Sequence, residues 1–279
     1  MGILLALAAA AAYGLSDFVG GLASRRTSAW PVAFVASVTA LLGGVVVATI
    51  DGGDPSGHAL LWGCLAGVGT GFGTTMLYRG LAAGRMAVVG PVSAVAAAVL
   101  PVAVGVATGE RPSVLVWLGI LLALPGIALA ASAEEQDEHA HPHDIGAVRD
   151  GLLAGAGFGL SFVGLGHVTS SAGLWPFALA QGVSVLLIAS LATVLRERWR
   201  PSRAADAWGM AAGLLACGAQ LGFLLAARST LLSVSSVLTS LYPAVTVLLA
   251  VAVLHERISP RQAIGLALCA GTVALVAAG

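Results

Sequence analysis

Apolar residues are arranged along this chain in ten long stretches that are separated by short polar connections. Each stretch is long enough, at about 1.5 Å per helical residue, to cross a hydrocarbon layer of roughly 30 Å. Only closed barrels and helices satisfy every backbone group inside a bilayer, and runs of this length and hydrophobicity predict helices. The pattern therefore predicts an all-α membrane protein whose ten transmembrane helices cover residues 2–22, 30–50, 58–82, 86–108, 112–132, 151–169, 175–195, 207–227, 231–254 and 260–278.

Composition supports a membrane protein with several spans. Hydrophobic residues make up 58% of the chain, charged residues only 9%, and the mean hydropathy is +0.96. A soluble domain carries about 25% charged residues, so this chain has too few to cover a surface that faces water. The net charge is zero and every basic residue is Arg, which argues against a nucleic-acid partner. Cys64, Cys217 and Cys269 all lie in apolar stretches and are interpreted as packing residues.

The first stretch resembles a signal peptide in its hydrophobicity, but it has no basic segment at its start, so a retained span is expected. Short motifs then recur between the two halves of the chain at an offset of 145 or 146 residues. The recurring motifs are Gly14-Leu15-Ser16 with Gly159-Leu160-Ser161, Trp30-Pro31 with Trp175-Pro176, Trp62-Gly63 with Trp208-Gly209, Gly67 with Gly213, Glu110-Arg111 with Glu256-Arg257, and Gly119 with Gly265.

This recurrence predicts two repeats of five spans, 1–132 and 150–279, joined by a linker at 133–149. An odd number of spans makes the second repeat enter the membrane from the opposite side, as in transporters whose binding sites lie between inverted repeats. Closely spaced glycines are expected to serve helix packing. Prolines inside spans, at Pro91, Pro101, Pro125 and Pro243, are expected to kink the helices or free carbonyl groups.

Arginine placement predicts the orientation. Arg111 and Arg228 fall on the side of the even-numbered loops, and eleven arginines fall on the other side: Arg25, Arg26, Arg79, Arg85, Arg149, Arg196, Arg198, Arg200, Arg203, Arg257 and Arg261. The positive-inside rule then places the odd-numbered loops in the cytoplasm and both termini outside. The linker carries His139, His141 and His143 beside carboxylates. Such a run can bind a divalent metal, but a solvated connection also needs charge, so we assign no metal and no cofactor.

Polar residues within the spans are the candidates for chemistry, because burying them in lipid is costly. Asp17 is the only acidic residue well inside a predicted span. We expect it to pair with Arg79, which lies at a similar depth; the alternative is a proton-coupling carboxylate. Glu110 and Glu256 are expected to stabilise turns. The remaining candidates, which together outline a substrate cavity, are Tyr13, Tyr78, Ser93, Gln181, Gln220, Thr239 and Tyr242. By position, Gln181 and Gln220 fall in the same half of the membrane.

These features together resemble the ten-helix EamA-type members of the drug/metabolite transporter superfamily. The resemblance covers the whole chain and rests on the two repeats, the turns Gly109-Glu110-Arg111 and His255-Glu256-Arg257, and Leu241-Tyr242-Pro243 before the second turn. It implies secondary transport, commonly export, of small metabolites or drugs. Relatives are often drawn with both termini inside, whereas the arginine distribution here predicts both outside.

The function expected from the sequence is therefore alternating-access transport of a small molecule across the inner or plasma membrane, with the lipid bilayer as the other partner and no enzymatic activity. The oligomeric state is not predicted. An intramembrane enzyme or a lipid-handling subunit is the alternative, and it would need a nucleophile and a base that converge inside the spans. His167 is the single histidine candidate for such a base. A passive channel is disfavoured because no repeated ring of charges appears.

Overall fold

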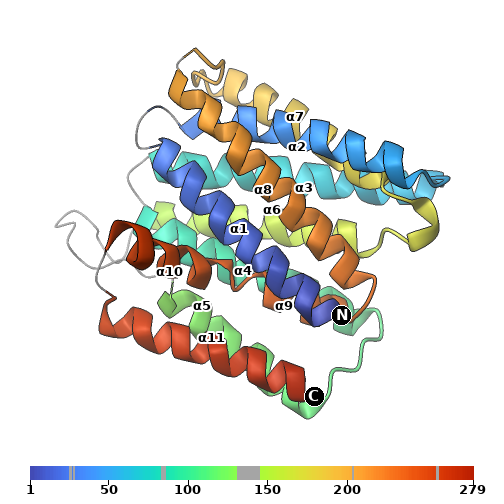
Figure 1. Ribbon diagram of the computed structural model, residues 1–279, viewed down its shortest axis with the longest axis vertical. Coiled ribbons are helices and arrows are strands. Elements are labelled where there is room, and N and C mark those ends of the chain that lie inside the picture. Colours follow the sequence, from blue (N-terminus) through green and yellow to red (C-terminus); the bar gives the residue numbers. More distant parts are fainter. Residues whose placement is uncertain (25–26, 28, 83–85, 131–144, 203, 256–257) are drawn as a thin grey trace.

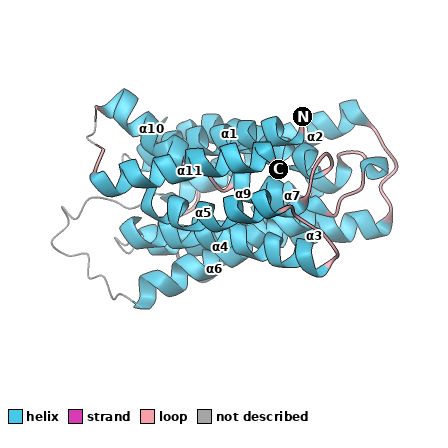
Figure 2. Cartoon of the chain, turned by 90° about the horizontal axis from the view of Figure 1, so that it is seen from below, coloured by secondary structure: helices cyan, strands magenta, loops and turns pink. Residues whose placement is uncertain are grey.

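The computed structural model describes residues 1–24, 27, 29–82, 86–130, 145–202, 204–255 and 258–279, and these residues form helices joined by short loops (Figures 1 and 2). The helices of the first half are α1 (Gly2–Ser24), α2 (Ala29–Asp51), α3 (Gly57–Ala82), α4 (Met86–Ala107) and α5 (Val114–Ala130). Those of the second half are α6 (Ile145–Gly166), α7 (Trp175–Val194), α8 (Trp208–Ala227), α9 (Leu232–Thr239), α10 (Tyr242–Leu254) and α11 (Pro260–Ala278), with short 3₁₀ helices at Ser170–Ala172 and Ala204–Ala207.

These helices confirm the predicted fold class. Eight segments of the described chain are long and apolar enough to cross a membrane, and two shorter apolar helices, Val92–Ala107 and Val114–Ala130, complete the set. The predicted ninth span is a single apolar segment, Leu232–Val253, in which α9 and α10 follow one another. The sixth helix begins at Ile145, which is six residues before the predicted start at residue 151.

Most contacts between helices recur when each helix is replaced by its counterpart in the other half, and we call these exchangeable contacts. α1 packs against α8 in the way that α6 packs against α3, and α2 packs against α8 as α7 packs against α3. α1 also contacts α9 and α10, while α6 contacts α4. The pairs α2 with α7, α4 with α9, and α5 with α11 each join a helix to its own counterpart. Such a pattern is expected of two five-span repeats that pack around an approximate twofold axis.

The repeated glycines lie at these exchangeable contacts. A Cβ atom at Gly67 of α3 would lie 2.4 Å from the carbonyl oxygen of Ala180 on α7. A Cβ atom at Gly213 of α8 would lie 2.2 Å from the carbonyl oxygen of Ala36 on α2. Both distances are shorter than any normal contact, so only glycine lets the two backbones approach this closely. The prediction that the closely spaced glycines serve packing is confirmed at Gly67.

The ninth span is interrupted just before Pro243, as its sequence predicted. Pro243 has no N–H group, so the carbonyl of Thr239 lacks the donor that a continuous helix would supply. Leu241 N donates to Leu238 O at 3.2 Å and Ala244 N donates to Leu241 O at 3.0 Å, which tightens the chain into a 3₁₀-like turn between α9 and α10. In contrast, α4 and α5 run through their prolines as single helices.

The end of the molecule that holds both termini (Figure 1) carries a contact between the halves, formed by Glu110. Gly109, with φ of 102°, turns the chain back after α4, and Glu110 N donates to Gly105 O at 2.9 Å. The Glu110 carboxylate then accepts hydrogen bonds from Leu232 N and from Ser233 N, the latter at 3.0 Å, and so caps the N-terminus of α9. The predicted role of Glu110 was to stabilise its own turn; its carboxylate instead caps a helix of the other half.

Glu256, its counterpart in the repeat, lies outside the described residues, as do His139, His141 and His143 of the linker. At the same end as Glu110, Arg228 donates to Thr169 O at 3.0 Å and to Gly173 O at 2.8 Å, which ties the end of α8 to the loop after α6. Partial burial lowers the pKa of the Arg228 guanidinium, against the opposing effect of the Asp51 carboxylate.

Candidate functional site

Asp17 lies within α1, seven residues before the helix ends at Ser24, which is about 10 Å along the helix axis. Its side chain is nevertheless exposed, and within the described part of the chain no cation lies at ion-pairing distance from it. A carboxylate facing lipid at this depth would cost up to about 2.5–3.5 kcal/mol, by insertion scales for the helix centre. This cost makes a position that faces water or a solute the favourable one for the Asp17 carboxylate.

The residues that precede Asp17 fix the rotation of α1 in the bundle. Gly14 packs so closely against α10 that a Cβ atom there would lie 2.8 Å from Tyr242 O and 2.6 Å from the Cβ of Val245. Ser16 donates its hydroxyl to Ala212 O of α8 at 2.8 Å. With both contacts in place, α1 cannot turn without breaking its packing, so the direction of the Asp17 side chain is set by the scaffold.

Aromatic side chains from several helices gather beside Asp17. Tyr13, one turn before it on α1, has its ring centroid 6.0 Å from that of Tyr242 on α10 and 6.4 Å from that of Phe162 on α6. Phe162 in turn lies 4.4 Å from Phe223 of α8. Ser93 of α4, whose hydroxyl donates to Gly90 O at 2.9 Å, lies near the Tyr242 side chain. The structure thus brings four of the predicted residues into one region between the halves; we call Tyr13, Asp17, Ser93 and Tyr242 the central group.

Arg79 does not pair with Asp17, and that prediction was wrong. Arg79 forms its ion pair with Asp150 of α6, whose side chain is buried and is also contacted by Arg149 at 3.3 Å. The physical reason lies in the packing: α3 packs against α6 and α7, whereas α1 packs mainly against α8, α9 and α10. Similar depth in the membrane did not make Asp17 and Arg79 neighbours.

Gln181 and Gln220 were predicted to lie in the same membrane half, and the structure joins them directly. Gln181 Nε2 donates to Gln220 Oε1 at 3.1 Å, and the exposed fractions of the two residues are 2% and 5%. Gly44 of α2 packs against Gln181, where a Cβ atom would lie 3.4 Å from Cγ. This pair therefore links α7 and α8 across the surface of α2, and each amide satisfies part of the other's hydrogen-bonding capacity in the interior.

Two predicted cavity residues lie elsewhere or outside the description. The Thr239 hydroxyl faces Ala6 O of α1 at 3.5 Å, which is the limit of hydrogen-bonding distance, at the end of α9. The side chain of Tyr78 lies outside the described residues. The predicted set thus separates into the central group, the glutamine pair, the Arg79 ion pair and the contact between α9 and α1.

Sequence reasoning missed three residues of these groups. Asp150 fell just outside the predicted sixth span, which began one residue later, at 151; the adjacent arginine was the available signal. Phe162 and Phe223 were not among the predicted residues. In a hydrophobic span, the residue type alone does not show whether an aromatic ring faces the lipid or the centre of the bundle.

Comparisons with known proteins agree with this architecture. A model of the EamA-like transporter family matches residues 1–132 and 150–278. No curated protein matches the chain. One solved structure, titled only "Crystal structure of protein", has a TM-score of 0.75 and 19% sequence identity over 98% of this chain and 95% of that chain, which supports the fold alone. Because the family model covers almost all of both halves, the chain belongs to the EamA-like transporter family, and it is a multi-pass membrane protein.

Proposed function

We propose that this protein is a secondary transporter that exports a small metabolite or drug by alternating access, and that the central group is where the solute binds. The observation that carries the proposal is the Asp17 carboxylate, which lies about 10 Å inside α1 beside Tyr13 and Tyr242 and has no ion-pair partner in the part of the chain that the structure describes. A charge at this depth has no structural partner to explain it among the described residues, so a role toward a solute or a proton explains it best.

The chemistry of the central group indicates the class of solute. Asp17 offers a negative charge, Tyr13 and Tyr242 offer hydroxyl groups and ring faces, and Phe162 adds an apolar ring. A solute with a cationic or hydrogen-bond-donating end and a flat apolar body would satisfy all of these groups together. A proton would compete with such a solute for the same carboxylate, which couples transport to the pH gradient.

The arrangement of the halves supports alternating access. The repeats at 1–132 and 150–279 contribute exchangeable helix contacts. If the halves are inverted in the membrane, exchange of their two conformations would open the central group first to one side and then to the other. In this proposal the arginine-rich odd-numbered loops face the cytoplasm of a cell membrane.

Transport in proteoliposomes tests the proposal. The purified chain would be reconstituted and offered a panel of labelled cationic, zwitterionic and neutral solutes, with and without a pH gradient. We expect at least one cationic or zwitterionic solute to move faster than in empty vesicles, and to respond to the gradient. In Asp17→Asn, which removes the titratable group with little change in shape, that response should disappear.

Asp54→Asn is the matched control, because Asp54 is an exposed carboxylate in the loop between α2 and α3. This variant should transport as the unmodified protein does. If Asp17→Asn transports with an unchanged rate and an unchanged dependence on the pH gradient, the assignment of the central group is wrong. If no solute of the panel moves in any condition, the proposed solute class is wrong.

A further inference from the structure

The loop between α7 and α8 concentrates positive charge at the end of a membrane span. α7 ends at Val194, and the residues that follow include Arg196, Arg198 and Arg200, all exposed, with Glu197 as the single acidic residue among them. The apolar segment Trp175–Val194 stops two residues before Arg196, so these arginines lie at the depth of the lipid headgroups. Arg203 continues the run in the sequence and lies outside the described residues.

One arginine of this loop, Arg196, has a left-handed backbone conformation that is unfavourable for a residue with a side chain. Glu197 N donates to Ala192 O at 2.8 Å, which closes the end of α7 in the way that normally requires glycine as the preceding residue. Here that residue is Arg196, with φ of 58°. The end of α4 is closed by the same kind of bond and uses Gly109 at the corresponding place. A residue with a Cβ atom is disfavoured in this conformation, so the side chain of Arg196 is present at a cost to the fold.

A tryptophan anchors the centre of the loop. Trp199 donates its indole N–H to the Thr193 hydroxyl at 2.9 Å, and its ring centroid lies 4.7 Å from that of Phe34 on α2. The guanidinium of Arg200 lies 5.6 Å from the Trp199 ring centroid. An indole ring held in this way at the end of a span is typical of the membrane–water interface, where its apolar body and its polar N–H each find a suitable environment.

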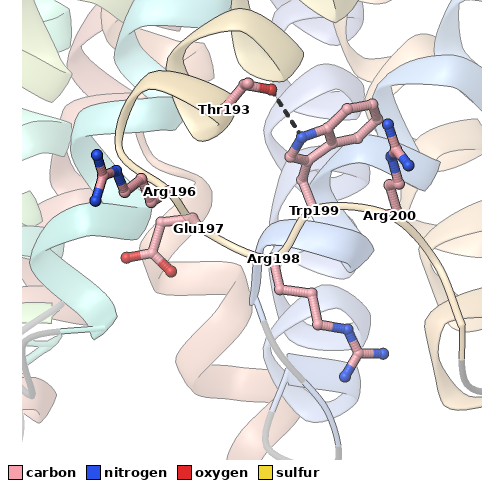
Figure 3. A pocket seen from close by; sticks show the side chains of 6 residues that line it. All are labelled: Thr193, Arg196, Glu197, Arg198, Trp199 and Arg200. Carbon is pink, nitrogen blue, oxygen red and sulfur yellow. Dashed lines mark hydrogen bonds between the residues drawn. The ribbon is translucent and has the colours of Figure 1, made fainter.

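The arginines spread around this anchor rather than enclosing one point. Figure 3 shows the side chains of Arg196, Arg198 and Arg200 pointing in different directions from the loop, with Trp199 between them. An open hollow of about 310 Å³ is lined by Thr193, Arg196, Glu197, Arg198, Trp199 and Arg200. A single small anion would contact one arginine at a time, whereas a layer of phosphate headgroups would reach all three.

We propose that the loop of residues 195–200 binds the phosphate groups of anionic phospholipids in the membrane surface that it meets. The proposal joins three observations: exposed arginines directly after a span, a strained position that retains one of them, and an anchored interfacial tryptophan. The positive-inside rule assigns this end to the leaflet that faces the cytoplasm, where anionic lipids attract basic segments near the span ends. The proposal does not depend on the identity of the transported solute.

The test measures lipid binding to the detergent-solubilised full chain by native mass spectrometry, with phosphatidylglycerol, phosphatidylcholine and inorganic phosphate as separate ligands. We expect phosphatidylglycerol to bind more tightly than phosphatidylcholine, and each arginine removed from the loop to weaken that binding about fivefold. Arg196→Gly is the most informative variant, because glycine relieves the left-handed backbone conformation. Its thermal stability should be equal or higher while its affinity for phosphatidylglycerol falls.

Arg198→Lys separates charge from guanidinium geometry, and it should lose less affinity than Arg198→Gln does. Arg111→Gln, at an exposed arginine on the other side of the membrane span, is the matched control and should bind phosphatidylglycerol as before. Equal binding of phosphatidylglycerol by the unmodified chain and by the triple variant R196G/R198Q/R200Q would overturn the proposal. Displacement of the lipid by an equal concentration of inorganic phosphate would also overturn it, because the site would then be one for soluble phosphate.

Discussion

The Glu110 cap predicts that Gly105→Ala lowers the free energy of unfolding when Glu110 is present and raises it when Glu110 is replaced by alanine. Gly105 lies in the last turn of α4, and a Cβ atom there would lie 2.3 Å from Oε2 of Glu110. Glu110 accepts hydrogen bonds from Leu232 N and Ser233 N at the start of α9. In Gly105→Ala the methyl group therefore has to displace the carboxylate from at least one of these N–H groups.

The magnitudes follow from the two opposing effects. Loss of one hydrogen bond to a charged group costs about 1.5–3 kcal/mol. Alanine in a helix interior is favoured over glycine by about 0.5–1 kcal/mol. In the unmodified background, Gly105→Ala should therefore destabilise the protein by about 1–2 kcal/mol. In Glu110→Ala no carboxylate remains to be displaced, and the same substitution should stabilise by about 0.5–1 kcal/mol.

The free energy of unfolding would be measured by titrating the four proteins of this cycle with sodium dodecyl sulfate in mixed micelles. The expected coupling between positions 105 and 110 is about 2 kcal/mol, well above the error of additive behaviour. Arg111→Ala, next to Glu110 and exposed, is the control and should leave the stability unchanged. If Gly105→Ala has the same effect with and without Glu110, the carboxylate does not occupy the position described, and the capping argument fails.

Two further pairs make testable predictions. Arg79→Asp should lower the free energy of unfolding strongly, because it leaves the buried Asp150 beside another carboxylate. The exchange variant, which combines Arg79→Asp with Asp150→Arg, should recover part of that loss. No recovery would argue against direct pairing. Gln181→Leu should lower the stability by about 1–3 kcal/mol, because it leaves the buried Gln220 amide without this hydrogen bond. In a thermal unfolding assay, the double variant with Gln220→Leu should be nearer in stability to the unmodified protein. Additive losses of stability from the two substitutions would contradict this.

The fold was predictable because its signals are local or repeated in the sequence. Apolar stretches of about twenty residues give the spans, and a repeat offset of 145 or 146 residues matches Gly67 with Gly213 at equivalent helix contacts. Pro243 likewise marks the interruption of the ninth span by its own chemistry, since it lacks an N–H group. In each case the residue type itself carries the structural consequence.

The grouping of polar residues was less predictable, because position along a helix gives depth but not the neighbouring helix. Asp17 and Arg79 shared a depth and were paired on that ground, yet α3 packs against α6, where Asp150 lies. The two glutamines also shared a depth, and they do form a hydrogen bond. Depth alone therefore succeeded once and failed once; the choice depends on which helices pack together, a property of the whole bundle.

The repeat also explains why the scaffold and the central group differ in predictability. The offset of 145 residues that aligns Gly14 with Gly159 aligns Asp17 with Phe162, and the offset of 146 that aligns Gly67 with Gly213 aligns Ala96 with Tyr242. Packing contacts have to be maintained in both halves for the helices to fit, whereas the side chains that face the centre contact each other and are free to differ. The central group is therefore asymmetric within an exchangeable scaffold. In the proposed cycle a single carboxylate, supplied by the first half alone, meets the solute whichever side is open, so one titratable group sets the coupling.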